Sequence, residues 1–384
     1  MKIAFAHMYT LRTPRGIERV IINLANALAK KGHDVTLITG RCPRPLTREW
    51  IDNRVQIHEI AHHNWHKLTF IPGFMKDFFS HEYDIVNLAI ARGEGYAAGL
   101  AYLFRKFRYN IIFHYPLENH EKHFNAFKRF GTARHADEMI AVSHYIARGV
   151  ERWFNRPVKV VPNGVNAEQF RPDPGRRADI RSKLNIPGDT PVLLTVSALQ
   201  GRKGISKVLD VVGCLKKSIP DVRYLVCGDG NEKDRELFFA QIAAHKLEAN
   251  VVFMGNQKDV SGFYNAADLF VFLPEFEGFG VVAIEAMASK LPVVVSRGSA
   301  FPEILADGGG VMVDADSPAS VAETIRTLLE DRSRMERMGA EGRAAVEAKY
   351  SWDAVASQLE NIFMDQINGK NILPQKAQKT ERTL

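Results

Sequence analysis

The chain has 384 residues, 46% of them hydrophobic and 25% charged, a composition typical of a soluble globular protein with room for two domains. No apolar run reaches the ~18 residues that a membrane-spanning helix needs. The short apolar run at the N-terminus soon meets His7 and Arg12, so we expect a first strand there and not a signal peptide. Three scattered cysteines without a C-x-x-C pair indicate a reducing cytoplasm, with no disulfide framework and no zinc site.

The net charge of +7 is unevenly distributed, because residues 1–165 carry 24 basic and only 14 acidic side chains. Two stretches of this half, 102–109 and 120–130, interleave basic with aromatic residues. Such stretches can lie on anionic membranes or bind nucleic acid, and they are also typical of a solvated helix face over a buried aromatic stripe. We expect no nucleic-acid partner and keep an anionic membrane surface as a candidate partner.

Strands and helices alternate along the first half of the chain. A helix is predicted over 17–31, because apolar residues recur there at helical spacing and Gly32 follows. Ser143 is placed to cap a later helix. Apolar runs predict strands at 2–7, 34–39, 55–60, 84–88, 111–114, 139–142 and 158–161. This alternation predicts a doubly wound α/β domain.

Proline, glycine and charged residues at 170–177 predict a linker, after which a second α/β series begins. Its strands are expected at 192–196, 224–227, 251–254, 269–273, 293–295 and 310–313, and its last helices at 317–330, 333–349 and 352–367. We therefore predict domains at 1–170 and 171–350. The final helix, about 352–368, is expected to pack back on the first domain, and residues 369–384 to form a flexible tail.

The stretch 274–288 joins an apolar strand to a helix through the glycine turn Gly278-Phe279-Gly280. A strand, a glycine turn and a helix N-terminus in this order present free N–H groups and a positive dipole end, which favour a phosphate. Glu277 and Glu285 lie eight positions apart on either side of the turn. They suggest a ligand with both a phosphate and a sugar, while an ordinary βα unit with solvated glutamates explains the same spacing.

Several segments, in order along nearly the whole chain, resemble the motifs of the retaining glycosyltransferases of glycosyltransferase family 4. The most specific of them is Glu277-x7-Glu285. The resemblance implies an α/β fold of the GT-B type, with two Rossmann-like domains facing across a cleft. The other matching segments are Arg15-Gly16-Ile17-Glu18, Gly32-His33-Asp34-Val35, Val142-Ser143-His144, Val161-Pro162-Asn163-Gly164-Val165, Arg202-Lys203-Gly204, Gly228-Asp229-Gly230, Ala266-Ala267-Asp268-Leu269, Pro292-Val293-Val294-Val295 and Pro302-Glu303-Ile304.

The resemblance also implies how a nucleotide-sugar would be held. Lys203 would pair with the diphosphate, and Arg202 could add a fork of donors. Gly16 would let the backbone approach the phosphates from the other domain. Glu285 would accept hydrogen bonds from the ribose, and Glu277 would contact the donor sugar.

The remaining expected contacts are made mostly by the backbone. The glycine turn, with Gly278 and the N–H groups of Phe279, Gly280 and Val281, would contact the donor sugar and phosphate. The base would lie near Gly255 and Asn256. His114, at the end of a strand, matches the family's histidine beside the sugar, so His114 and Glu277 are the expected catalytic residues.

One departure from the family affects the phosphate site. Many relatives carry Gly-Arg at the end of the first strand of the second domain, whereas this chain has Ser197-Ala198-Leu199. Arg202, four residues after Ala198, is the candidate to replace the missing arginine, since its long side chain can reach back over the turn.

The expected function is a retaining transfer of a hexose from a nucleotide-sugar, UDP-glucose or a similar donor, to a glycan or lipid-linked acceptor of the cell envelope. The enzyme would be cytoplasmic and peripheral to the membrane. No cofactor or obligatory metal is expected, since the loops predicted to face the cleft lack an Asp-x-Asp pair. The alternatives are a non-catalytic nucleotide-sugar-binding partner subunit, or an epimerase or phosphorylase on the same fold. A dinucleotide oxidoreductase is disfavoured because no G-x-G-x-x-G follows the first strand.

Overall fold

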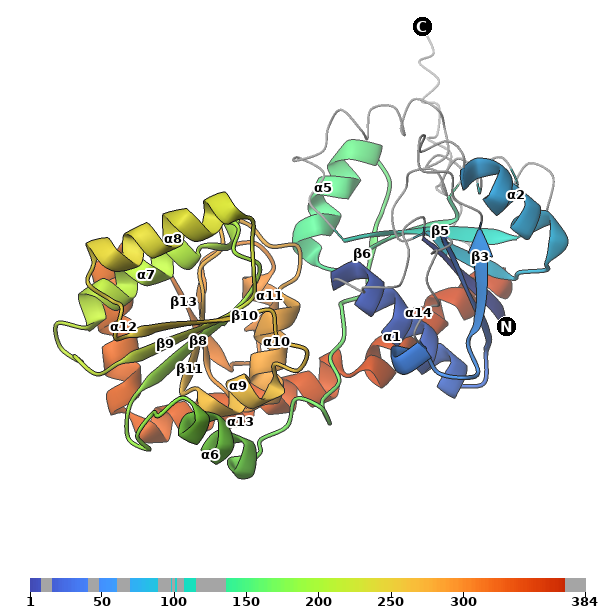
Figure 1. Cartoon of the computed structure of the whole chain (residues 1–384). Helices are drawn as coiled ribbons and strands as arrows, with labels where there is room; N and C mark the ends of the chain where they lie inside the picture. Colours follow the sequence, from blue (N-terminus) through green and yellow to red (C-terminus); the bar gives the residue numbers. More distant parts are fainter. Residues whose placement is uncertain are drawn as a thin grey trace, which may run out of the picture. The chain divides into compact units, whose positions relative to one another are not determined.

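The computed structural model describes residues 1–7, 16–40, 48–60, 70–88, 98, 101, 107–114 and 136–369. Within them the chain forms two parallel β-sheets with helices packed around each (Figure 1). The chain divides into two compact units. The first contains residues 1–113, 120–140 and 356–384, and the second contains residues 114–119 and 141–355. Among the described residues, no helix is long and apolar enough to cross a membrane.

The first sheet has seven strands in the order β3-β2-β1-β4-β5-β6-β7. Its central strands are almost wholly buried, as expected for parallel strands covered on both faces. The predicted strands are confirmed, with ends that differ by at most three residues. Their bounds are β1 Lys2–His7, β2 Asp34–Gly40, β3 Gln56–Ile60, β4 Ile85–Leu88, β5 Arg108–Phe113, β6 Glu138–Ala141 and β7 Lys159–Val160.

Two helices of the first half show why the sequence pattern predicts their positions. Helix α1 (Gly16–Lys30) buries the apolar positions that recur at helical spacing, and it ends before Gly32, whose φ of 90° lies in the left-handed region. Helix α5 (His144–Phe154) begins at the predicted cap, because the Ser143 hydroxyl accepts a hydrogen bond from the Ile146 N–H.

The second sheet has six strands in the order β10-β9-β8-β11-β12-β13. Its strands β8 and β11 start two series that run in opposite directions, the pattern of a doubly wound Rossmann-like domain. The predicted strands are again confirmed to within one residue at each end. Their bounds are β8 Val192–Val196, β9 Arg223–Cys227, β10 Val251–Gly255, β11 Leu269–Phe272, β12 Val293–Ser296 and β13 Gly310–Val313.

Helices cover both faces of this second sheet (Figure 1). Side chains of α7, α8 and α12 join the buried strand residues in one apolar core. Helices α9, α10 and α11 lie on the opposite face (Figure 1), while α13 contributes Met338 to the core formed with α7, α8 and α12. The bounds are α7 Ile205–Leu215, α8 Glu232–Ala244, α9 Ser261–Ala266, α10 Val281–Ala288, α11 Phe301–Ile304, α12 Pro318–Glu330 and α13 Arg332–Ala345.

The predicted linker at 170–177 is wrong in its second half, where helix α6 (Pro174–Lys183) begins. The residues that indicated a linker are start signals for this helix: Asp173 caps it by accepting from the Arg176 N–H at 3.0 Å, and proline occupies its first turn. Arg177 and Arg181 then bind the two carboxylate oxygens of Asp268 at 2.7 and 2.8 Å. Through these two ion pairs, Asp268 holds α6 against the second sheet.

The C-terminal helices follow the prediction closely, with one irregularity. Helix α13 passes into a π-helical turn at Val346–Tyr350 before α14 (Trp352–Ile367) begins. From residue 356 onward α14 is grouped with the first unit. There Glu360 binds Lys31 Nζ and His33 Nε2, both at 2.8 Å.

Some expectations concern segments outside the described residues or are not tested by the structure. The basic stretch 120–130, residues 102–106 of the other basic stretch, and the tail from 370 onward lie outside the described residues. The domain boundary near residue 170 stays a prediction, since β7 belongs to the first sheet while residues from 141 onward are grouped with the second unit.

The Glu360 cluster generates a pH-dependent prediction. Hydrogen bonds from Lys31 and His33 lower the pKa of Glu360, so its contribution is present at neutral pH and is lost as pH falls through this lowered folded-state pKa. We expect Glu360→Gln to reduce the free energy of unfolding by about 1 kcal/mol at pH 7 and by much less under acid conditions. Urea unfolding at both pH values measures this.

The matched control is Glu336→Gln, which removes an exposed carboxylate that pairs with Arg332 at 2.9 Å. This variant should leave the free energy of unfolding almost unchanged at either pH. An equal decrease in the free energy of unfolding in the two variants would contradict the assigned role of Glu360.

Candidate active site

Lys203, Glu277 and the glycine turn, all expected site residues of the second unit, lie at the carboxyl ends of β8 and β11. These neighbouring strands are the point from which the strand order runs both ways, and ligands of open α/β sheets bind beside such a point. Lys203 lies in a short 3-10 turn (η4, Gly201–Lys203) after β8, and Glu277 lies in the loop after β11.

The centre of the site is an ion pair between Lys203 Nζ and Glu277 Oε2 at 2.6 Å. Both side chains are mostly buried, 17% and 18% exposed, so the pair is only weakly screened by water. Gly204 allows the two loops to approach, because a Cβ at this position (φ 72°) would overlap the carbonyl of Leu273. The Glu275 N–H also donates to the Arg202 carbonyl at 2.9 Å.

Further hydrogen bonds fix the orientation of Glu277. Its Oε1 accepts from the Gly278 N–H at 3.1 Å, and its own N–H donates to Ser299 Oγ at 3.0 Å. A lysine ammonium has three donors and each carboxylate oxygen two acceptor positions. Lys203 therefore retains donors for an anion, and Glu277 retains acceptor positions for hydroxyl groups.

The glycine turn lies against the backbone of His114, a residue grouped with the same unit. A Cβ at Gly278 would come within 2.6 Å of the His114 carbonyl oxygen, and Ser143 Oγ donates to the Gly278 carbonyl at 2.7 Å. The structure thus places the backbone of buried His114 beside the turn. Phe279 is buried edge-to-face against Tyr350, with ring centroids 5.7 Å apart, which holds the turn in place.

The start of α10 has the features of an anion site. Gly280 is its N-cap with φ 95°, a conformation that favours glycine, and it supplies no side chain to cap the helix. The amides of the first turn, from Val281, therefore have no capping side chain, and the positive end of the helix dipole lies here.

Glu285, inside α10, has a specific partner. The hydroxyl of Tyr264, on α9, donates to Glu285 Oε2 at 2.7 Å. Burial, followed by the charge of Glu285, raises the pKa of Tyr264 well above its ordinary value, so the phenol remains a neutral donor. Tyr264 was not predicted, since nothing in the sequence links it to a residue 21 positions away.

The loops after β9 and β10 show which glycines are structural. A Cβ at Gly228 would overlap the Ser197 carbonyl, and one at Gly230 would lie 2.6 Å from the Leu199 carbonyl oxygen. Both are needed for close packing of the protein itself. Gly255, with φ 65°, has open space around it, and Asn256 beside it is exposed, so both are accessible to a ligand.

Two further residues of the expected site are Arg202 and Gly16. The Arg202 guanidinium lies over the Phe276 ring, 5.3 Å from its centroid, a cation–π contact that the sequence did not indicate. Gly16 starts α1 in the first unit. A Cβ at Gly16 would meet nothing within 4 Å, so no contact among the described residues requires glycine there.

One Asp-x-Asp pair follows β13, at Asp314-Ala315-Asp316. The Asp316 N–H donates to Asp314 Oδ1 at 3.1 Å, and Lys207 binds Asp316 Oδ1 at 2.5 Å. These contacts give the pair a structural role.

Comparison with known families matches both halves of the chain. Residues 14–169 match the family described as Glycosyltransferase Family 4, and residues 176–345 match the one described as Glycosyl transferases group 1. The chain belongs to this glycosyltransferase family. The two matches together account for most of its length, and the family resemblance expected from the motifs is confirmed.

Curated relatives match over part of their length. The chain is 32% identical over 247 residues to D-inositol 3-phosphate glycosyltransferase of Corynebacterium glutamicum, covering 62% of this chain and 57% of the relative. It is 29% identical over 251 residues to a GDP-mannose-dependent monoacylated alpha-(1-6)-phosphatidylinositol monomannoside mannosyltransferase of the same species, covering 62% and 64%. The chain thus spans less than two thirds of these relatives.

Solved structures match over nearly the whole chain. Anabaena HepE in complex with UDP-glucose has a TM-score of 0.82 at 19% identity, covering 95% of this chain and 100% of that one. Sucrose-phosphate synthase of Thermosynechococcus elongatus has a TM-score of 0.81 at 22% identity, covering 96% and 99%. At these identities the comparison shows the fold, and the predicted GT-B class with two Rossmann-like domains is confirmed.

The pairing of Tyr264 with Glu285 generates a prediction. Tyr264→Phe removes the donor that orients the Glu285 carboxylate and should lower the free energy of unfolding by about 1–2 kcal/mol. If Glu285 binds a ribose, the same change should weaken nucleotide binding several-fold. Calorimetric titration with nucleotide and urea unfolding measure the two effects.

Tyr224→Phe is a matched control, because its buried hydroxyl donates at 2.8 Å to Thr195 instead of to a site carboxylate. It should lower stability and leave nucleotide affinity unchanged. Equal affinity in both variants and the unmodified chain would contradict a ligand role for Glu285.

Proposed function

We propose that this chain is a retaining hexosyltransferase that uses a nucleoside diphosphate sugar as donor. The observation that carries the proposal is the grouping of Lys203, Glu277, Gly280 and Glu285 around the ends of β8 and β11. A cation, a helix N-terminus and two carboxylates match the parts of such a donor: phosphates, sugar and ribose.

The diphosphate would bind at Lys203 and at the first-turn amides of α10. An ammonium ion and a helix dipole both stabilise the charge that grows on a departing diphosphate. Glu277 holds Lys203 in place before the donor arrives. It would then accept hydrogen bonds from the donor sugar, while Glu285, oriented by Tyr264, would accept from the ribose.

The reaction breaks the bond between the anomeric carbon and the diphosphate oxygen. The acceptor hydroxyl attacks from the same face, and its proton passes to the departing diphosphate, so the configuration is retained. We assign His114 and Glu277 to the donor sugar, where positive charge develops at the anomeric carbon. Arg202 and Gly16 are assigned to the diphosphate, and Gly278, Phe279, Gly255 and Asn256 to backbone contacts with sugar, phosphate and base.

The donor is proposed to be a UDP-hexose such as UDP-glucose, with GDP-mannose as the competing candidate. Among the relatives described above, the mannosyltransferase is GDP-mannose-dependent by name, and the structure of HepE holds UDP-glucose. A cell-envelope glycan or glycolipid is the proposed acceptor. The basic excess of residues 1–165 supports work at the cytoplasmic face of an anionic membrane.

A non-catalytic nucleotide-sugar-binding subunit is the second candidate, and an epimerase on the same fold is the third. Donor turnover separates the hexosyltransferase from the binding subunit, because a binding subunit would neither transfer nor hydrolyse the sugar. Conversion of the nucleotide-sugar to its epimer, without transfer, would indicate the third.

Lys203→Ala tests the phosphate site. The nucleotide-sugar that most raises the melting temperature identifies the donor. Removing the ammonium should then weaken binding of that donor by at least about 100-fold, since a charged hydrogen bond and the partner of Glu277 are lost together. Isothermal titration calorimetry measures the change in Kd.

Lys207→Ala is the control, since Lys207 lies four residues away and pairs with Asp316 outside the site. It should bind the donor normally. Donor affinity that survives Lys203→Ala would refute this placement of the phosphates.

The transfer should proceed without a divalent ion, because Lys203 and the α10 N-terminus supply the positive charge. We expect the initial rate with the identified donor and acceptor to be unchanged after treatment with EDTA. Loss of activity with EDTA and its return with Mn²⁺ would contradict this.

A further inference from the structure

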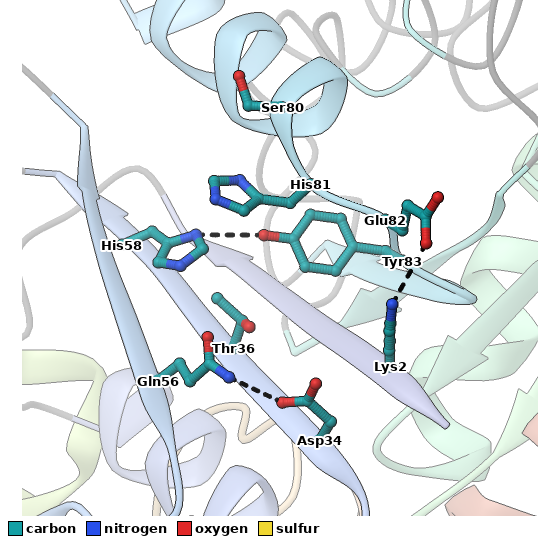
Figure 2. A pocket seen from close by; sticks show the side chains of 9 residues that line it. All are labelled: Lys2, Asp34, Thr36, Gln56, His58, Ser80, His81, Glu82 and Tyr83. Atoms are coloured by element: carbon teal, nitrogen blue, oxygen red, sulfur yellow. Dashed lines mark hydrogen bonds and ion pairs between the residues drawn. The ribbon is translucent and has the colours of Figure 1, made fainter.

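A small polar pocket lies in the first unit, and none of the residues that line it is among those assigned to the donor. It has a volume of about 260 Å3 and is lined by side chains from β1, β2 and β3 and from the end of α2 (Phe70–Ser80) onward. Figure 2 shows His58, His81 and Tyr83 converging over it. His58, His81 and Tyr83 belong to no motif of the glycosyltransferase resemblance.

Two side chains that line this pocket, His58 and His81, and the neighbouring Asp77 offer metal-ligating atoms at short range. His58, Asp77 and His81 each supply one such atom, and all three atoms lie within 4.8 Å of one another. Asp77 Oδ2 is the common point, 2.8 Å from His58 Nδ1 and 3.4 Å from His81 Nδ1. In a tetrahedral zinc site with bonds of ~2.0–2.1 Å, ligand atoms lie about 3.3 Å apart. The two distances to Asp77 are near that value, and the two imidazole nitrogens lie within 4.8 Å of each other, so rotation of the side chains would bring the three atoms into a ligand set.

The three ligands lie on ordered elements. His58 lies on β3, which is paired with β2 along its whole length. Asp77 is in the last turn of α2, and His81 comes directly after the helix, where its N–H donates to the Asp77 carbonyl at 3.0 Å. The spacing of four residues brings the two side chains together.

Apolar contacts fix α2 against the sheet. Phe74 and Phe78 are fully buried, and a Cβ at Gly73 would overlap the side chain of Ile60. Such support limits the movement of ligands, which favours a preorganised site.

A neighbouring hydroxyl orients the carboxylate. Tyr83 donates to Asp77 Oδ1 at 2.7 Å, which leaves Oδ2 directed at the two imidazoles. Ligating carboxylates in metal sites are commonly held in this way. The His81 side chain is 47% exposed, so an ion has a path from solvent and a position for a bound water.

We propose that His58, Asp77 and His81 form a binding site for one first-row divalent transition metal ion, for which Zn²⁺ is the probe. Two imidazole nitrogens and one carboxylate oxygen suit Zn²⁺, whereas Mg²⁺ and Ca²⁺ prefer oxygen ligands alone. The ion joins β3 to the end of α2 and stabilises the first unit. It takes no part in sugar transfer, so its removal lowers the melting temperature without stopping the reaction.

The competing explanation is a hydrogen-bonded histidine–aspartate pair without a metal. The second unit offers an example, His245 Nε2 with Asp210 Oδ1 at 2.9 Å, and it has no third ligand in the described residues. The chain has 13 histidines, so zinc binding by itself does not locate the site. Single variants of His81 and of His245 separate a metal site from a hydrogen-bonded histidine–aspartate pair.

The experiment is a calorimetric titration of the full chain, first stripped of metal, with ZnCl2, together with a count of bound zinc after dialysis. We expect one tightly bound ion per chain in the unmodified protein and in His245→Ala. In His81→Ala, affinity should fall by about 100-fold or more and the bound ion should be lost. Zinc should raise the melting temperature of the unmodified chain and of His245→Ala but not that of His81→Ala.

His58→Gln is the second variant, in case His81→Ala alters folding, which circular dichroism reports. Bound Co²⁺ adds a spectroscopic test, because its visible absorption changes when a nitrogen ligand is lost. Zinc binding that persists unchanged in both variants, or the absence of a tight site in the unmodified chain, would overturn the proposal. Neither outcome affects the donor site, whose residues lie in the second unit or, for Gly16, outside this cluster.

Discussion

The ion pair between Lys203 and Glu277 links the ends of two adjacent strands, and the candidate site is arranged around it. Both charges are mostly buried, so each side chain helps to hold the other in place. The pair requires the loops after β8 and β11 to touch, and that contact requires glycine at 204. A bound diphosphate would share the ammonium that Glu277 already orients, so the site is largely formed before the ligand arrives.

The glycines of the family motifs divide into two groups with different physical reasons. Gly204, Gly228 and Gly230 are required because another backbone segment occupies the space of a Cβ. A Cβ at Gly16 or Gly255 would meet only open space, so a ligand could approach the backbone at these two positions. Asp268 likewise belongs to the scaffold, since Arg177 and Arg181 use both its oxygens to hold α6. A motif residue is therefore not by itself a ligand contact.

Most of the fold could be predicted because buried parallel strands are short apolar runs, and helices such as α1 repeat their apolar positions. The start of α6 could not, because Asp173 and Pro174 serve as well in a linker as in a helix cap. Local sequence located the glycine turn and both glutamates. It could not indicate that Glu277 pairs with Lys203, or Glu285 with Tyr264, since these contacts join residues 74 and 21 positions apart. The cluster of His58, Asp77 and His81 was missed for the same reason: only the fold brings a strand and a helix end together.

The most direct test of the account is a crystal structure of the chain with the nucleoside diphosphate that stabilises it most. The account predicts a phosphate oxygen within hydrogen-bond distance of Lys203 Nζ and of the first amides of α10, with the ribose hydroxyls at Glu285. A nucleotide bound elsewhere, with the Lys203–Glu277 pair unchanged and no ligand at Gly280, would contradict it.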